Sequence, residues 1–354
     1  MAGSYAVELA DKSGGFVQIR ANGDEQDVNE PAAPMVAASS CPSSSTAQTY
    51  LFVTIPDAIP PTGGSGSSGT WDPTQETAYG SVDISASGST VNLANIRQFT
   101  LPSAGGSGAP AQPAAASLSG ICGATYYGNT IEVPGQVTIT NPGTTGATYT
   151  TQATIGIGAS GLLVEDNDSG TVTAAAGSTE APLTYENALG AGTGAVGLPK
   201  SSAAVDTGAV VGAQYLGFIY SPGVYSSDPL ATNWSSHLAS FGFSTVPSGC
   251  SSIAPKTSTL IYGGSFTNDD PTTSSDGFGN CNFAVDLGAQ DATTNGLYPQ
   301  ATVWVAATYP ANATGATYSF PAVAIAGQLN GKYAIFLIGV DSAEPWAIYL
   351  LQSN

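Results

Sequence analysis

The chain has 354 residues, a formal net charge of -19 and 9% charged residues, whereas typical soluble domains have about 25% charged residues. Its 6 Lys and Arg residues are spread thinly among 25 Asp and Glu residues. This balance excludes nucleic acids and anionic membrane surfaces as expected partners, because binding them requires clustered basic side chains that neutralise several phosphates.

The length allows one large domain or two medium ones. No run approaches the ~20 consecutive apolar residues of a transmembrane helix. The first residues, "MAGSYAVELADKSG", lack the basic and then apolar profile of a signal peptide, so we expect that Met1 replaces a removed export signal. Scarce Lys and Arg leave few sites for trypsin-like proteases, which favours an extracellular or bacterial cell-surface location over a cytoplasmic one.

Alternating or β-branched runs bounded by Gly, Pro, Asn, Asp or Ser predict strands along the whole chain. The nearest candidate for a helix, "PLTYENALGAG" at 182–192, is cut short by its glycines. The segments 60–75 and 102–117 are rich in Gly and Ser and are predicted to be loops. The fold class is therefore all-β. The predicted strands are 49–55, 79–85, 90–101, 129–133, 214–220, 259–264, 301–309, 332–340 and 346–352.

Three segments share the order of an apolar strand, an acidic turn and a return strand. They are residues 3–19, 160–174 and 331–351. Asp and Asn favour such turns because their side chains bond nearby backbone amides. We expect residues 1–20 to form an N-terminal hairpin that pairs with the C-terminal hairpin and covers an exposed sheet edge.

Several strings recur in the same order in the two halves of the chain, which indicates an internal duplication. The predicted units are residues 21–175 and 190–354. We expect two related antiparallel β-sandwich or barrel-like halves, with a β-propeller as the alternative, since ~20 short strands would also fill five blades. The matching pairs are "TGATY" at 145–149 and 314–318, "AQTYLFVTIP" at 47–56 and "AQYLGFIYSP" at 213–222, 134–139 and 298–305, and 152–168 and 321–341.

The four cysteines include no C-x-x-C pair, so two structural disulfides are expected, which also implies export. Four cysteines allow three pairings. The duplication places Cys122 and Cys281 at corresponding positions, so each is expected to pair within its own half, Cys41 with Cys122 and Cys250 with Cys281.

Residues for catalysis are not singled out by any motif. His237 is the only histidine and no G-x-S-x-G sequence accompanies it, so it is interpreted as a polar surface residue, and multi-histidine metal sites are excluded. A glycoside hydrolase needs only two carboxylates at a suitable separation, for which Glu132, Glu165 and Glu186 are as eligible as any others. No catalytic residue is assigned.

Two acidic segments have the composition of calcium-binding loops, "EDNDSG" and "NDDPTTSSDGFGN". Calcium takes six to eight oxygen ligands, which closely spaced Asp and Asn side chains can supply. The alternative is that these residues are solvent-facing turn formers, since neither segment completes an EF-hand. Apart from Ca²⁺, no cofactor is expected. The candidate ligands are Asp166 and Asp168 in the first segment, and Asp269, Asp270, Asp276 and Asn280 in the second.

Aromatic side chains flanked by polar residues are candidates for sugar binding, because a sugar ring offers apolar C–H faces ringed by hydroxyls. The alternative is that they pack in β cores. The candidates are Trp71, Tyr126, Tyr127 and Trp234.

The segments "VGAQYLGFIYSP", "IGIGASGLLVEDN" and "LNGKYAIFLIGVD" resemble a group of exported, often lipid-anchored, Gly/Ser/Thr-rich proteins of soil bacteria. The resemblance covers most of the chain and implies a location, not an activity. The chain departs from the group in having no cysteine near its N-terminus to carry a lipid.

The expected function is that of a non-catalytic extracellular or cell-surface binding protein, with a polysaccharide or another surface glycan as the ligand. The alternatives are a carboxylate-dependent polysaccharide hydrolase and a structural protein of the envelope or matrix.

Overall fold

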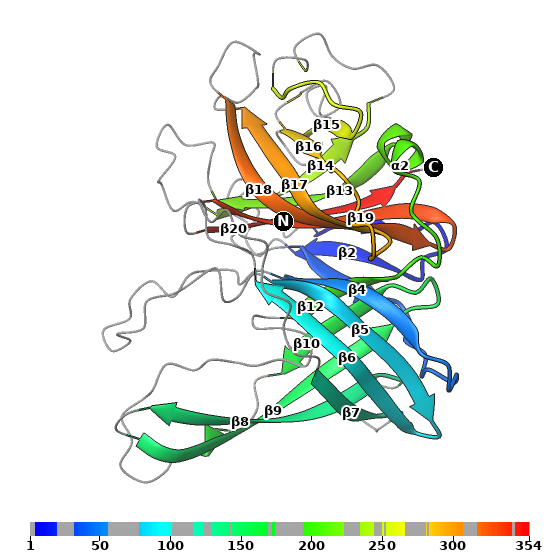
Figure 1. Cartoon of the computed structure of the whole chain (residues 1–354), viewed down its shortest axis with the longest axis vertical. Coiled ribbons are helices and arrows are strands. Elements are labelled where there is room, and N and C mark those ends of the chain that lie inside the picture. Colours follow the sequence, from blue (N-terminus) through cyan, green and yellow to red (C-terminus); the bar gives the residue numbers. More distant parts are fainter. Residues whose placement is uncertain are drawn as a thin grey trace.

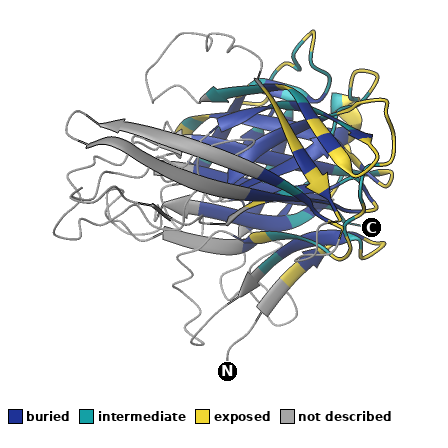
Figure 2. Cartoon of the chain, turned by 90° about the horizontal axis from the view of Figure 1, so that it is seen from below, coloured by how far each residue is buried: buried dark blue, intermediate teal, exposed yellow. Residues whose placement is uncertain are grey.

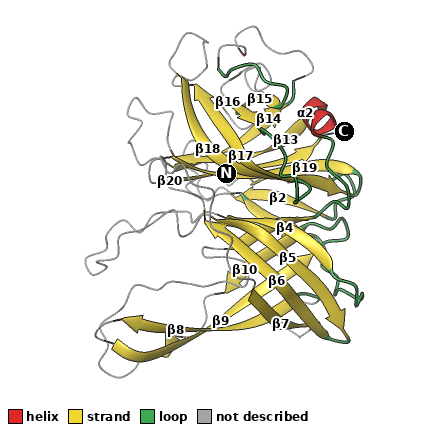
Figure 3. Ribbon diagram, in the orientation of Figure 1, coloured by secondary structure: helices red, strands yellow, loops and turns green. Residues whose placement is uncertain are grey.

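The protein is described from a computed structural model, which covers residues 4–19, 32–55, 78–100, 116–123, 129–141, 144–168, 172–173, 194–222, 234–243, 250, 253–265, 281, 283–306, 317–341 and 344–353. These residues form strands β1 to β20 and one short helix, α2 (Thr207–Gly212) (Figure 3). The predicted all-β class is confirmed. None of the described residues forms a helix of the length and hydropathy that a membrane crossing requires.

The first half is a closed barrel of eight antiparallel strands in the order β10-β12-β4-β5-β6-β7-β8-β9, which the pairing of β9 with β10 closes. Residues alternate along each strand: Tyr50 and Phe52 belong to the barrel interior, while Leu51 and Val53 belong to the core between the two barrels. The strands are β4 (Gln48–Ile55), β5 (Ala78–Ser87), β6 (Thr90–Thr100), β7 (Ala116–Cys122), β8 (Ile131–Asn141), β9 (Thr144–Ile157), β10 (Leu163–Asp168) and β12 (Gly194–Pro199), with the short β11 (Val172–Thr173) paired to β9.

The second half is a closed barrel in which the strands follow chain order and β20 returns to pair with β13. Its interior holds large side chains such as Phe241, Phe283 and Trp346, all buried. The strands are β13 (Tyr215–Pro222), β14 (Trp234–Phe241), β15 (Leu260–Ser265), β16 (Phe283–Asp286), β17 (Leu297–Ala306), β18 (Thr317–Leu329), β19 (Lys332–Asp341) and β20 (Glu344–Gln352).

The matching sequence strings fall on equivalent strands of the two barrels. The AQ strings lead into β4 and β13, the first strand of each barrel, and the TGATY strings lie at the start of β9 and just before and within β18, the sixth strand of each. The prediction of two related antiparallel halves is thus confirmed. The propeller alternative is wrong, because each half is one continuous ring and not a set of separate blades.

The boundary predicted between the halves is displaced. Strand β12 at Gly194–Pro199 inserts between β10 and β4 and so completes the first barrel, although we placed the start of the second unit at residue 190. The second barrel begins only at Tyr215. The first ring needs this eighth strand because β4 would otherwise present an unpaired edge.

A three-stranded sheet, β1 (Ser4–Glu8), β2 (Gly14–Ile19) and β3 (Ala33–Val36), is separate from both barrels. Figure 1 shows β2 between the two barrels, with β19 on one side and β4 on the other. The strand pairing that we predicted between this N-terminal hairpin and the C-terminal hairpin is wrong. Strand β20 already has β13 and β19 as neighbours, so it offers no free edge.

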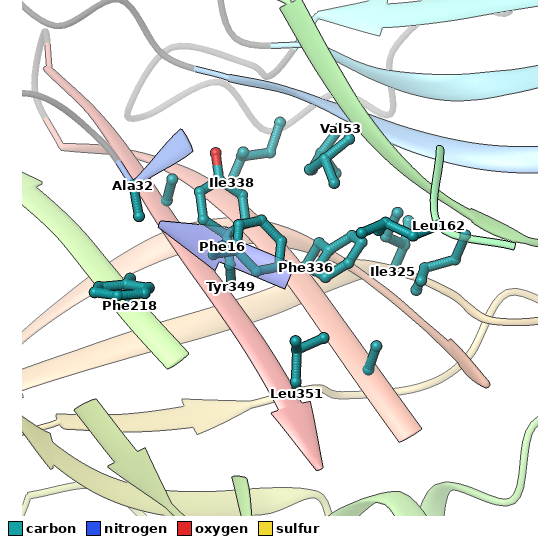
Figure 4. Packing of buried hydrophobic residues seen from close by; sticks show 14 of the residues in the cluster. Phe16, Ala32, Val53, Leu162, Phe218, Ile325, Phe336, Ile338, Tyr349 and Leu351 are labelled. Carbon is teal, nitrogen blue, oxygen red and sulfur yellow. The ribbon is translucent and has the colours of Figure 1, made fainter. Parts of the chain in front are cut away.

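Contact between the hairpin and the second barrel is instead made by side chains. The Phe16 ring stacks on Tyr349 with centroids 4.8 Å apart and meets Phe336 edge-on at 5.4 Å (Figure 4). Phe16 is fully buried. Figure 2 shows that buried residues also make up much of the described strands. Burial of a side chain of this size contributes roughly 1.5–3 kcal/mol, so the hairpin helps to hold the two barrels together.

The predicted disulfides, Cys41–Cys122 and Cys250–Cys281, are both present, with Cα separations of 5.6 and 5.1 Å. The predicted correspondence of Cys122 with Cys281 is wrong in detail. They lie on equivalent strands but at opposite ends, since Cys122 ends β7 and Cys281 precedes β16. The two bridges therefore fasten different parts of the two barrels.

Candidate functional site

The chain that leads into the first barrel crosses one end of it, which we call the first mouth. Three attachments hold this leading segment, residues 40–46. The Ser40 N–H donates to the Ile157 carbonyl at the end of β9 (3.0 Å), and the Ala86 N–H of β5 donates to the Ser44 carbonyl (2.9 Å). Cys41 is joined to the end of β7 by its disulfide. The segment is thus tied to the rim at three strands.

A pocket of about 270 Å³ lies between the leading segment and the barrel interior. Its floor consists of Tyr50, Ile84 and Ile157, which belong to the buried core of the barrel. Its rim is exposed and uncharged, with hydroxyl and amide groups from Ser40, Ser43, Ser44, Thr46 and Gln48. An apolar floor with a few polar groups around it is typical of a small-molecule site.

Some rim groups are already oriented by local hydrogen bonds. The Ser44 hydroxyl oxygen accepts from the Thr46 N–H at 3.0 Å, which leaves its proton available to a ligand. The Gln48 amide donates to the Thr49 carbonyl at 2.9 Å, which leaves its Oε1 available as an acceptor. The rim can therefore both donate and accept.

Tyr50 is the polar group of the floor. It is 7% exposed, and among the described residues its hydroxyl has no hydrogen-bond partner. Burial raises the pKa of the Tyr50 hydroxyl, because the phenolate would lose its hydration. A tyrosine hydroxyl is protonated at neutral pH in any case, so this group can donate a hydrogen bond into the pocket.

The equivalent end of the second barrel, the second mouth, is filled by helix α2. Asp206 caps this helix by accepting from the Ala209 N–H (3.1 Å), and Val210 is fully buried in the barrel interior. The Tyr215 hydroxyl donates to the Val210 carbonyl at 2.6 Å. The two barrels thus differ at their mouths, one of which is occupied by the chain itself.

Three of the aromatic candidates, Trp71, Tyr126 and Tyr127, lie outside the described residues. Trp71 comes in the sequence between the end of β4 at Ile55 and the start of β5 at Ala78, and both of these strand ends are at the end of the barrel opposite the first mouth. Tyr126 and Tyr127 come between the end of β7 and the start of β8, and these two strand ends are at the first mouth. Trp234 begins β14 of the second barrel, opposite Pro222. Chain connectivity therefore does not bring the four candidates together.

The calcium candidates of the second acidic segment, Asp269, Asp270, Asp276 and Asn280, also lie outside the described residues. The first segment is not a turn as predicted, because Asp166 and Asp168 are residues of β10 and face Thr154 and Gln152 of β9. Pairing with neighbouring strands outweighs the local preference for a turn. No group of three or more His, Cys, Asp or Glu residues within the described part of the chain could hold a metal ion.

The remaining sequence candidates that the structure describes do not line the pocket. His237 lies on β14 opposite Ile219, Glu132 lies on β8, and Glu165 of β10 is buried. Glu186 lies outside the described residues. The pocket was not predicted from the sequence, although the run of small hydroxyl residues around Cys41, "SSCPSSST", shortly before the predicted strand at 49–55 was a signal for it.

The chain matches no protein-family model and no curated protein. Among solved structures it is similar to a mutant of the vaccine antigen transferrin binding protein B (TbpB) from Haemophilus parasuis. The two sequences are 8% identical, the match covers 100% of this chain and 86% of that chain, and the TM-score is 0.23. Similarity at this level assigns no function, so the chemistry of the first mouth rests on its own residues.

Proposed function

We propose that the protein is a non-catalytic binding protein of the extracellular space or the cell surface, and that it binds carbohydrate at the first mouth. The observation that carries this proposal is the pocket itself, in which exposed hydroxyl and amide groups surround a floor of Tyr50, Ile84 and Ile157. Sugar rings present the matching combination of apolar C–H faces and peripheral hydroxyls.

The charge of the site favours a neutral glycan. None of the described residues that line the pocket carries a charge. The whole chain has a formal net charge of -19, which repels acidic polysaccharides over distances of about a Debye length. Neutral sugars avoid this repulsion and can still use the hydroxyl groups of the rim.

The two disulfides and the low content of charged residues support a location outside the cytoplasm, because disulfides persist in oxidising compartments. Calcium binding by the segment from Asp269 to Asn280 stays a separate prediction, and it can be measured as a change in melting temperature on adding Ca²⁺.

Calorimetric titration with a panel of neutral and acidic oligosaccharides tests the proposal. We expect at least one neutral member to bind, and Gln48→Ala to weaken that binding about tenfold through the loss of one hydrogen bond. Gln214→Ala is the matched control, because it removes an exposed glutamine at the second mouth. Binding confined to acidic members, or release of reducing ends from the bound sugar, would overturn the proposal.

A further inference from the structure

Tyr50 and Tyr215 occupy the same position in the two barrels. Each faces the last residue of the final strand of its barrel, Pro199 of β12 for Tyr50 and Gln352 of β20 for Tyr215. The residue before each tyrosine also accepts the same backbone bond, from Lys200 N–H to Thr49 and from Ser353 N–H to Gln214, both at 2.8 Å. The two phenol rings are therefore equivalent parts of the duplicated scaffold.

The second barrel shows what this tyrosine binds when its mouth is filled. The Tyr215 hydroxyl donates to the peptide carbonyl of Val210 at 2.6 Å, and the Val210 side chain packs into the barrel interior beside it. The acceptor is thus an amide carbonyl, and an aliphatic group accompanies it. Helix α2 supplies both from within the chain.

The first barrel keeps the donor and lacks the helix. The leading segment crosses its mouth without forming a helix and leaves the pocket of about 270 Å³ beside Tyr50. The aliphatic partners of the floor, Ile84 and Ile157, are present as well. A ligand that reproduces the interactions of the second mouth must bring a neutral carbonyl acceptor and a small apolar group.

We propose that the ligand of the first mouth is an N-acetylated sugar whose acetamido carbonyl accepts a hydrogen bond from the Tyr50 hydroxyl, as the Val210 carbonyl does from Tyr215. This inference rests on the proposed carbohydrate function and names the sugar class. The acetyl methyl group packs against Ile84 and Ile157, and the ring hydroxyls meet Ser44 and Gln48.

Two properties of the site support this assignment. Tyr50 lies in the pocket lining at the position equivalent to Tyr215, so its hydroxyl is a donor in the same place. An amide carbonyl is a strong, neutral acceptor and suits a pocket whose described lining is uncharged. A peptide would also bring an amide carbonyl, but the hydroxyl-rich rim favours a ligand that carries several hydroxyls of its own.

The test compares three β-1,4-linked disaccharides that differ only at the C2 substituent: N,N′-diacetylchitobiose with acetamido groups, cellobiose with hydroxyls and chitobiose with free amines. Titration into the whole oxidised protein should show the acetylated sugar binding at least about tenfold more tightly than cellobiose. The free amine should bind more weakly than the acetylated sugar, because it lacks the carbonyl. This comparison needs no variant and so does not depend on whether a mutant folds.

Variants then locate the interaction. Tyr50→Phe should reduce the preference for the acetylated sugar to about threefold or less, whereas Tyr215→Phe, the matched control, should leave the preference unchanged. Equal binding of acetylated sugar and cellobiose would overturn this inference and leave the proposed function standing. Binding of none of the three disaccharides would also overturn this inference alone, whereas binding of an N-acetylated dipeptide in their place would overturn both.

Discussion

The two mouths show how one barrel scaffold gives two different ends. Both barrels close in the same way and place a tyrosine at the same position, but α2 fills the second mouth and a segment without helix or strand spans the first. The wall of the barrel was therefore kept in the duplication, while the chain leading into it changed. The leading segment decides whether the barrel end is packed or open to a ligand.

The composition of the two leading segments explains the difference. The sequence "DTGAVVG" begins with the capping residue Asp206 and carries Val210 on the face that turns inward. The sequence "SCPSSSTA" has Pro42 and a run of serines, which favour turns and extended chain over helix. It also has a cysteine, which supplies by a covalent bond the attachment that α2 obtains by packing.

The largest expected effect comes from removing the disulfide at the first mouth. The Cys41→Ser and Cys122→Ser double variant opens a loop with a sequence separation of 81 residues, which should cost about 4.5 kcal/mol of unfolding free energy. Sugar binding should weaken at least about tenfold because Cys41 lines the pocket. Urea unfolding and titration measure the two effects.

The second disulfide provides the control for this experiment. Removing Cys250–Cys281, with a separation of 31 residues, should cost about 3.7 kcal/mol and leave sugar binding unchanged. Equal loss of binding in both double variants would show that the first disulfide acts on the pocket only through general stability.

A smaller effect is expected from Val210→Ala, which removes the apolar group that fills the second mouth. The change should lower the free energy of unfolding by about 2 kcal/mol, since two buried methyl groups are lost. Binding at the first mouth should not change. The half-buried neighbour provides the comparison, and Val211→Ala should cost under about 1 kcal/mol in the same urea titration.

The smallest expected difference between the two mouths is in how the free energy of unfolding depends on pH. Burial raises the pKa of both Tyr50 and Tyr215. The contribution of each hydroxyl to the free energy of unfolding is therefore fully present below the unfolded pKa of about 10, and it is lost as the pH rises through the pKa of the folded state. Each tyrosine should add about 1.4 kcal/mol per pH unit to the decline above pH ~10. Denaturation at several alkaline pH values checks this.

Phenylalanine substitutions resolve the two contributions. Tyr50→Phe and Tyr215→Phe should each reduce the slope of the free energy of unfolding against alkaline pH by about 1.4 kcal/mol per pH unit, which corresponds to one proton. Only Tyr215→Phe should also lower stability at neutral pH, because it loses the hydrogen bond to Val210. An unchanged slope in either variant would show that the tyrosine ionises as freely in the folded protein as in the unfolded chain.

Much of the scaffold could be predicted because strand patterns and ordered repeats are local properties of the sequence. The strings leading into β4 and β13 were sufficient to align the two first strands. Strand β12, "GAVGLP", was missed because a Gly- and Ala-rich segment has no clear alternation, and its place is set by the gap between β10 and β4. Helix α2 was missed because six residues are too few to show a helical period.

The pocket could not be predicted for a different reason. Its floor and rim come from β4, β5, β9 and the leading segment, which only the closed ring brings together. The predicted turn at Asp166 was wrong because Asp as a residue type favours turns, whereas Asp166 here pairs with strands on both sides. Sites built from surface loops of low complexity give still weaker signals.

The position of Phe16 has a consequence for synthesis of the chain. The ring belongs to β2, which is synthesised before either barrel, while its stacking partner Tyr349 belongs to β20, the final strand of the second barrel. Each barrel can close from neighbouring hairpins, but the joint between them must wait for β20. Until then the apolar faces of β2 and β4 stay uncovered, so the nascent protein passes through a stage in which both are open to chaperones and to aggregation.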